Sequence, residues 1–396
     1  MERTERFLNV RYALIQTAYW GIFCALNGYA AVYLDGKGFT AGQTGVMMAL
    51  VNIFAALLQP AVAAKADKEG RISLKELVLL LSGVSTAALA LLIAVGNGFK
   101  AVSILFFVAL VSQLILQPLV NAVGMYYINR GEKVNFGFAR GIGSVAYALV
   151  SYLAGALTGK YGVTVIPVIA VLLFLLFIAI SFSFQIKIVH RQAGESAGED
   201  SFLVLFKKYK TFTVFLFGVV IMFIFHFMTN TYMFQMVQNV GGDSGSMGIA
   251  VSVAAVCEIP VMVFFDKLVK RVRVETLLRA AAVCWTIKAV AFCFCTNVGG
   301  IYAAQVLQLG SFGIYVPASV YYANQVIDEK NQVKAQAMVT TAFTIGSVFG
   351  NFLGGKMIDA FGVSRMLIAA AACTAAGTVL FFAGTKRVDK QPEQCI

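Results

Sequence analysis

Long apolar runs alternate with short polar stretches along the chain, from residue 12 to residue 384. Most runs have about 20 residues, the length at which an α-helix crosses the hydrocarbon core of a bilayer. Strands of a membrane barrel would be about half as long and would alternate in polarity, so these runs predict helices. Twelve spans are predicted, over residues 12–34, 44–64, 77–96, 101–128, 136–159, 165–184, 212–234, 247–265, 277–295, 301–323, 337–355 and 366–384.

The composition supports a membrane protein built only from helices. Of 396 residues, 59% are hydrophobic and 13% charged, and the mean hydropathy is +0.81. A soluble domain would need about a quarter of its residues charged. The start "MERTER" leads into a span too long for the apolar part of a signal peptide, so no cleavable signal is expected.

The positive charges predict an orientation. Most of the 31 Lys and Arg residues fall in the N-terminus, the even-numbered turns and the C-terminus, and few lie in the odd-numbered turns. Cytoplasmic loops carry such an excess, so both termini are expected in the cytoplasm of a bacterium and the spans in its cytoplasmic (inner) membrane. The net charge of +12 is therefore a topology signal, and no nucleic-acid partner is expected.

The chain is predicted to divide into two halves. The polar, Gly- and Ser-containing stretch within 186–210 reads as a cytoplasmic linker between a six-helix bundle at 1–185 and a second at 211–396. Acidic–basic turns follow the second span of each half, from Ala63 to Arg71 and from Phe264 to Arg273. This repetition predicts two parallel repeats. A monomer is expected.

Several function classes are excluded. The chain has no GxxxxGK[ST] phosphate loop, which argues against ATP-driven transport. We find no hydrolytic constellation, and the pair Cys293 and Cys295 has neither metal-ligand spacing nor a histidine cluster beside it. The sequence therefore predicts a protein that is not an enzyme and needs no metal or cofactor.

Four ionisable residues lie inside predicted spans: Arg140, His226, Glu258 and Lys288. A charge at the centre of a span costs roughly 2.5–3.5 kcal/mol on insertion scales, and such residues usually face the bundle interior or a water-filled cavity. Arg140 or Lys288 would instead snorkel to the interface if it lay near a helix end. The pattern favours a shared cavity, with Glu258 as its only carboxylate.

Polar residues recur at helical spacing in the same spans. Arg140, Ser144 and Tyr147 share one face of their span. Other stripes are Gln16, Trp20, Phe23 and Asn27; Gln113, Gln117 and Asn121; His226 and Asn230; and Gln305, Gln308, Ser311 or Phe312, and Tyr315. Each stripe alone could serve only to form hydrogen bonds between neighbouring helices. Together, amides and aromatic rings favour a binding site for a small polar molecule such as a sugar or nucleoside.

Three stretches of the sequence, "AAKADKEGR", "NFGFARGIGSVAYAL" and "CEIPVMVFF", carry a family resemblance. Through them the chain resembles the lactose-permease-like proton symporters of the major facilitator superfamily. "AAKADKEGR" resembles that group's gating turn, with Asp67, Gly70 and Arg71 matched, and Asp266 lies in the second-half counterpart. "NFGFARGIGSVAYAL" resembles the span whose Arg binds sugar beside a stacking aromatic residue. This implies substrate contacts at Arg140 and Tyr147, and "CEIPVMVFF" implies proton coupling at Glu258.

The chain also departs from that group. Gln308 and Ser311 stand where the permease has a histidine and an acid, and Asn121 or Ala122 stands where it has a carboxylate. Lys288 falls near its span-nine arginine. The resemblance therefore implies that any proton coupling runs through Glu258.

The expected function is proton-coupled uptake of a sugar or nucleoside by alternating access. The expected substrate-binding residues are Arg140, Ser144, Tyr147, Asn121, His226, Asn230, Lys288 and Gln308, with Asp67, Gly70, Arg71 and Asp266 as gating residues. Alternatives of the same fold are an aromatic-acid importer, with the acid bound at Arg140, and a drug exporter. An alternative of another class is a ligand-sensing membrane receptor.

The gating turn yields a first prediction. Asp67 is expected to accept hydrogen bonds or pair with a cation on the cytoplasmic side when that side is closed. Asp67→Asn should therefore slow transport and change substrate affinity little, as measured by uptake into proteoliposomes and by equilibrium binding. An unchanged transport rate would reduce this turn to a topology signal.

Overall fold

The computed structural model describes residues 2–67, 73–96, 98–128, 130–132, 134–184 and 200–385. These residues form helices joined by short turns, without a strand among them. The first group of helices is α1 (Glu2–Phe23), the π-helix η1 (Cys24–Gly28), α2 (Ala30–Asp35), α3 (Ala41–Asp67), α4 (Leu74–Val95), α5 (Phe99–Ile128), α6 (Phe136–Tyr161) and α7 (Val165–Phe182). The second is α8 (Phe202–Lys208), α9 (Lys210–Thr231), α10 (Met233–Asn239), α11 (Ser244–Arg271), α12 (Val274–Cys293), α13 (Val298–Val306), α14 (Phe312–Val326), the 3-10 helix η2 (Glu329–Asn331), α15 (Gln332–Phe361) and α16 (Val363–Gly384).

Ten predicted spans coincide with helices long and apolar enough to cross a membrane. The first and tenth predicted spans fall on interrupted helices instead. The first runs through α1, η1 and α2, and the tenth is broken between α13 and α14 at residues 307–311. The helical membrane fold is confirmed, whereas the count of twelve spans stays a prediction.

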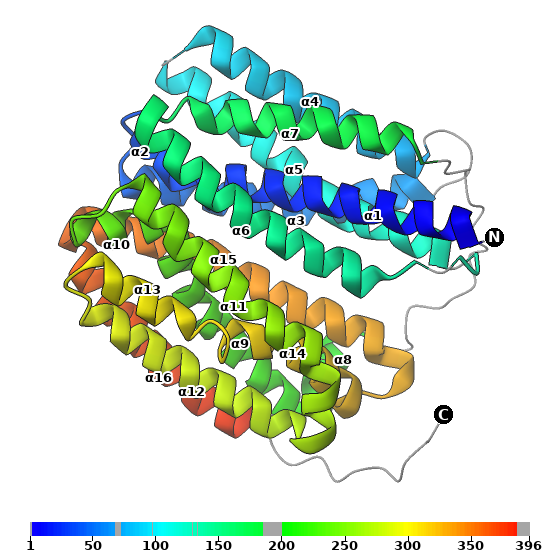
Figure 1. The fold of residues 1–396 in the computed structure, drawn as a ribbon. Helices are drawn as coiled ribbons and strands as arrows, with labels where there is room; N and C mark the ends of the chain where they lie inside the picture. The colour runs from blue at the N-terminus through cyan, green and yellow to red at the C-terminus, as the bar shows by residue number, and fades with distance from the viewer. Residues whose placement is uncertain are drawn as a thin grey trace.

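The helices gather into two groups that carry the same backbone features. Figure 1 shows α1–α7 in its upper part and α9–α16 in its lower part. A kink follows α9 at Tyr232 (φ −101°, ψ 22°), matching the one after η1 at Tyr29 (φ −106°, ψ 12°). The next turn of each group has a left-handed glycine at φ +83°, Gly38 and Gly241. The two groups are thus structural repeats, while the boundaries 1–185 and 211–396 remain a prediction.

The two groups contact each other through α3 with α15 and α6 with α11. Glycines permit this approach. A Cβ atom on Gly155 would lie 2.6 Å from the Ser244 carbonyl oxygen, and one on Gly45 would lie 2.4 Å from that of Asn351. The backbones are therefore packed as closely as small-residue contacts allow in membranes.

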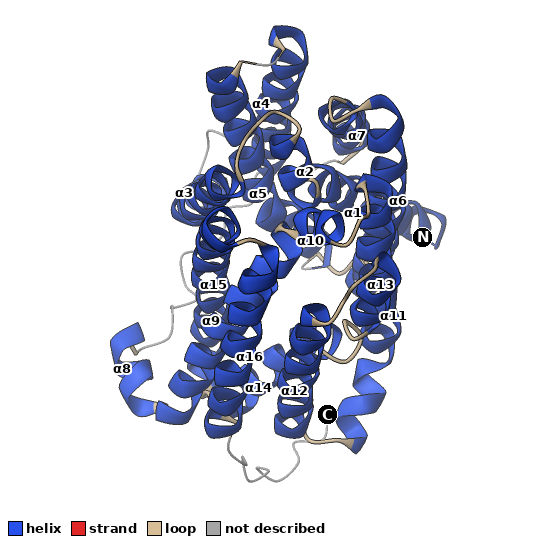
Figure 2. Cartoon of the chain, turned by 90° about the vertical axis from the view of Figure 1, so that its left-hand side faces the viewer, coloured by secondary structure: helices blue, strands red, loops and turns tan. Residues whose placement is uncertain are grey.

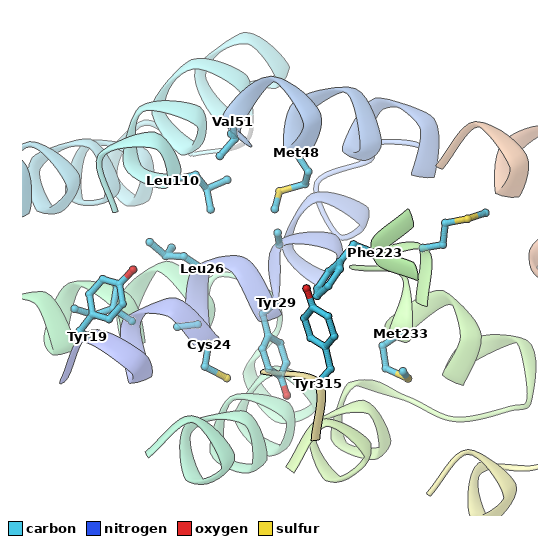
Figure 3. Packing of buried hydrophobic residues seen from close by; sticks show 14 of the residues in the cluster. Tyr19, Cys24, Leu26, Tyr29, Met48, Val51, Leu110, Phe223, Met233 and Tyr315 are labelled. Carbon is cyan, nitrogen blue, oxygen red and sulfur yellow. The ribbon is translucent and has the colours of Figure 1, made fainter. Parts of the chain in front are cut away.

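Two tyrosines occupy corresponding places in these contacts. The Tyr29 hydroxyl donates to the Ser151 carbonyl at 2.5 Å, beside the α6–α11 contact. The Tyr232 hydroxyl donates to the Asn351 carbonyl at 2.6 Å and lies 3.2 Å from the Ala41 carbonyl oxygen, in the α3–α15 contact. Tyr29 is among the buried core residues in Figure 3. We call these two contacts the glycine–tyrosine latches.

A carboxylate adds to the second latch. Asp359 Oδ2 accepts from the Thr40 hydroxyl at 2.6 Å and from the Gly42 amide at 2.9 Å. Asp359 of α15 thereby accepts from the Gly42 amide, which has no partner within α3, at the helix end where the dipole also favours negative charge.

All described hydrogen bonds between α1–α7 and α9–α16 lie toward one end of the molecule, the end that faces the viewer in Figure 2. This end carries the turns at Gly38, Gly241 and Gly362. The N-terminus lies at the opposite end in Figure 1. The described hydrogen bonds between the two groups are therefore concentrated at one end, which we call the closed end.

The glycine contact predicts how the closed end can be opened. Gly155→Val places carbon atoms against the backbone of α11, and such overpacking costs about 1–3 kcal/mol. The population should shift about tenfold toward a state that is open at this end. Spin labels at Lys160→Cys and Asn239→Cys, in a background without native cysteines, would report the longer distance.

Gly141→Val is the matched control, because a Cβ on Gly141 of the same helix meets no atom within 4 Å. Identical distance distributions for the two variants would refute this role of the α6–α11 contact.

Candidate functional site

Arg140 lies on the second turn of α6. The helix begins after the N-cap residue Asn135, whose side-chain oxygen accepts a hydrogen bond from the Phe138 amide. The guanidinium donates from Nη1 to the Ser144 hydroxyl at 3.0 Å. Its carbon Cζ lies 3.7 Å from the ring centroid of Trp20 on α1. The i, i+4 spacing read from the sequence therefore corresponds to a direct contact between Arg140 and Ser144.

A glycine lets Trp20 reach this position. A Cβ on Gly143 would lie 2.5 Å from the indole ring, whereas Gly141 has open space around it. The indole Nε1 donates to Gln16 at 3.1 Å, and Gln16 donates in turn to Asn121 Oδ1 at 3.3 Å. Side chains of α1, α5 and α6 thus form one polar chain that ends at Arg140.

Tyr147 lies farther along α6, toward the closed end. Its ring is 6.4 Å from that of Phe23, and its hydroxyl oxygen would be 3.1 Å from a Cβ on Gly28. Tyr147 is half-buried against the interrupted first helix. The structure therefore places an aromatic wall of α1 and α6 next to Arg140.

The second group holds a chain of three polar side chains. The Lys288 ammonium on α12 donates to Gln308 Oε1 at 2.5 Å. The Gln308 amide donates to Glu258 Oε1 on α11 at 2.7 Å. Lys288 and Gln308 are almost fully buried, and Glu258 is partly exposed. One neutral amide therefore links the two opposite charges, which form no direct ion pair.

Gln308 lies in the break between α13 and α14. The backbone there departs from α-helical bonding, because the Gly313 amide donates to the carbonyl of Gln308 itself, five residues back, at 3.0 Å. Gly310 and Pro317 flank this segment, and Pro317 lacks the amide that would continue the helix. Such loosened turns are common at functional sites.

An aromatic cluster surrounds His226 on α9. Its ring stacks on Phe312 with centroids 4.8 Å apart and an interplanar angle of 5°. The Asn230 amide lies 2.8 Å from His226 Nε2 and donates to it. Trp285 lies 6.0 Å from His226, and its buried indole nitrogen has no hydrogen-bond partner. Sequence reasoning missed Trp285, although it lies three residues before Lys288 on the same helix.

The polar chain that ends at Arg140 and the one that ends at Glu258 interact electrostatically. Glu258 interacts electrostatically with both Arg140 and Lys288. The helices α6 and α11 that carry Arg140 and Glu258 are in contact. The candidate site therefore lies between the two groups of helices, farther from the closed end than the glycine–tyrosine latches.

Comparison with known families identifies the chain. Residues 10–369 match the model of the MFS_1 like family, which describes major facilitator transporters. The chain belongs to this family.

Known proteins support this assignment along the whole chain. A maltose permease of Geobacillus stearothermophilus is 24% identical over 383 residues, covering 95% of this chain and 93% of the relative. The uncharacterized transporter YwbF of Bacillus subtilis (strain 168) is 21% identical over 336 residues, covering 83% and 81%. The crystal structure of the nucleoside transporter NupG (D323A mutant) shares the fold, with a TM-score of 0.82, 13% identity, and coverage of 96% and 100%.

The family and the fold establish a multi-pass membrane transporter, not an enzyme. Within the described part of the chain, no group of three His, Cys, Asp or Glu residues is placed to hold a metal ion.

The predicted gating residues are described in part, and their role stays a prediction. Asp266, exposed on α11, accepts from the Tyr321 hydroxyl of α14 at 2.9 Å. The side chain of Asp67 lies outside the described residues, as do Gly70 and Arg71.

The three-residue chain predicts a stability effect. Gln308→Leu removes the partner of both Lys288 and Glu258, and an unsatisfied buried polar group costs about 1–3 kcal/mol. The unfolding temperature in detergent should fall clearly below that of the unmodified transporter.

Gln305→Leu is the matched control, since the Gln305 carbonyl oxygen is buried without a partner and its loss should cost little. Equal unfolding temperatures for both variants would contradict a structural role of the Gln308 amide.

Proposed function

We propose that this transporter takes up a small polar organic substrate, a sugar or a nucleoside, by proton-coupled alternating access. The observation that carries the proposal is the pair of polar chains, one ending at Arg140 and one at Glu258, on helices that pack across the two groups. Similarity to a maltose permease and a nucleoside transporter supports the substrate class.

The substrate would bind between the aromatic walls of the two groups. Arg140, Ser144, Asn121 and Tyr147 would line one side, and His226, Asn230, Lys288 and Gln308 the other. The polar side chains of the site would form hydrogen bonds with the hydroxyl groups of the substrate, while Trp20 and Phe312 offer flat apolar faces. This combination suits sugars and nucleosides, which have polar rims and less polar faces.

The closed end would be the outer side of the membrane. The positive charges favour a cytoplasmic location of both termini in a bacterial cytoplasmic (inner) membrane, so the end opposite the closed end would face the cytoplasm. The described state would then be inward-open, with the bundles 1–185 and 211–396 as the moving bodies. A single chain contains both repeats, which supports a monomer as the working unit.

Glu258 would carry the coupled proton. Its carboxylate accepts a hydrogen bond from Gln308 and interacts electrostatically with Arg140 and Lys288. A change in the packing of α6 against α11 would alter the distance between Glu258 and Arg140, and with it the affinity of Glu258 for a proton. Protonation outside and release inside would link proton entry to substrate entry.

An aromatic-acid importer is the second candidate. No described carboxylate forms an ion pair with Arg140, which leaves the guanidinium available to an acidic substrate. A drug exporter would depend less on Arg140, and a ligand-sensing receptor would bind substrate without moving it.

The coupling role predicts a separation of two activities. Glu258→Gln mimics the protonated acid, so uptake against a gradient should be lost while exchange across preloaded vesicles continues. Proteoliposomes with an imposed pH gradient measure the first, and counterflow measures the second.

Glu132→Gln, in an exposed turn, is the control and should keep both activities. Undiminished uphill uptake by Glu258→Gln would eliminate Glu258 as the coupling site.

A further inference from the structure

The guanidinium of Arg140 is surrounded by neutral groups. Its contacts are the Ser144 hydroxyl and the face of Trp20, and Trp20 is bonded to the amide of Gln16. Among the described residues, no carboxylate comes within 4.0 Å of its nitrogen atoms. Within the described part of the chain, Arg140 therefore has no carboxylate in direct ion-pair contact.

Lys288, the other cation of the site, does not supply negative charge near Arg140 either. Lys288 donates to the neutral Gln308 oxygen, and Gln308 passes one hydrogen bond to Glu258. Among the described residues, Glu258 is the carboxylate that this chain of hydrogen bonds reaches. With all three groups ionised, the site holds one positive charge more than it holds negative charges.

The geometry of Arg140 suits an anionic partner. Trp20 covers one side of the guanidinium, with Cζ 3.7 Å from the ring centroid, and so limits the positions that the group can take. Among the described residues, Arg140 donates only from Nη1, to Ser144, and no acceptor for Nη2 or Nε is found there. A guanidinium edge with such donors matches the paired oxygens of a carboxylate.

We infer that the natural substrate carries one carboxylate, which binds at Arg140, and that it is a sugar acid. This inference rests on the proposed function and specifies its substrate class. The shared chemistry is the carboxylate, which either a sugar body or an aromatic body could carry. The Ser144 hydroxyl bonded to Arg140 favours the sugar body, as do the amides of Gln16 and Asn121 that are linked to Arg140 through Trp20.

Charge conservation strengthens the inference. The empty site has one excess positive charge. A proton added to Glu258 raises this excess by one, and a bound carboxylate lowers it by one. The loaded site then has the same charge as the empty site, so both conformational changes of the cycle occur without altering the charge held inside the membrane. A neutral sugar with a proton would instead leave an additional charge there, which the bilayer penalises.

Binding tests the substrate class with the purified full chain. The probes are D-glucuronate and D-galacturonate, their neutral counterparts D-glucose and D-galactose, uridine, and 3-phenylpropionate. We expect the uronates to raise the unfolding temperature and the neutral sugars to do so much less. Arg140→Lys, which keeps the charge but loses the paired donors, should weaken uronate binding at least about tenfold.

Arg279→Gln is the control for loss of a cation, because Arg279 bonds Thr385 on the far side of α12. It should leave uronate binding unchanged. Equal binding of uronates to the Arg140→Lys variant and the unmodified transporter would refute the assignment of the carboxylate to Arg140.

Transport tests the charge balance. In proteoliposomes, uronate uptake should follow the pH gradient and should not respond to a potassium diffusion potential set with valinomycin. Uptake accelerated by a negative interior would show net positive charge movement and overturn the inference.

The outcomes separate this inference from the proposed function. Binding of neutral sugars or uridine without uronates would overturn the inference and leave the proposed function standing. Binding of 3-phenylpropionate alone would keep the carboxylate at Arg140 but replace the sugar body, and so would overturn both the inferred sugar acid and the proposed substrate class. Binding of none of the probes would count against both.

Discussion

Burial of charge inside a membrane-spanning bundle is the constraint on which this structure depends. Lys288 and Glu258 could lie in the bundle only with partners, and the Gln308 amide supplies one to each. A neutral bridge differs from a direct ion pair, because the carboxylate can gain or lose a proton without leaving the ammonium unbonded. The amide therefore stabilises the fold and leaves the charge state of Glu258 free to vary.

The break between α13 and α14 follows from the same constraint. A regular helix would keep the Gln308 backbone in the α-helical ladder and fix the direction of its side chain. The loosened turn at residues 307–311 lets the amide reach both Lys288 and Glu258. The interrupted first helix has a comparable effect, since η1 and the kink at Tyr29 direct the tyrosine hydroxyl to α6. Irregular backbone thus occurs where polar groups must meet inside the bundle.

Much of this arrangement could be predicted from the sequence, because long apolar runs and rare internal charges are local signals. Arg140 and Ser144 proved to be in contact, as their spacing indicated. Other parts could not be predicted. A continuous apolar run looks the same whether its helix is straight or broken, so the kinks at Tyr29 and Tyr232 were not foreseen. The bridge from Lys288 to Glu258 depends on how three helices are rotated against each other, which only tertiary packing determines.

The chemistry of the glycine–tyrosine latches has a consequence for the medium in which the protein works. The Tyr29 latch joins a hydroxyl group to a backbone carbonyl and packs glycine against backbone, whereas the Tyr232 latch also contains the Asp359 carboxylate. Dissolved salt screens interactions between charges and has little effect on short, buried, neutral hydrogen bonds. The Tyr29 latch should therefore hold equally well at low and high salt, whereas added salt should weaken the contribution of the exposed Asp359 carboxylate to the Tyr232 latch.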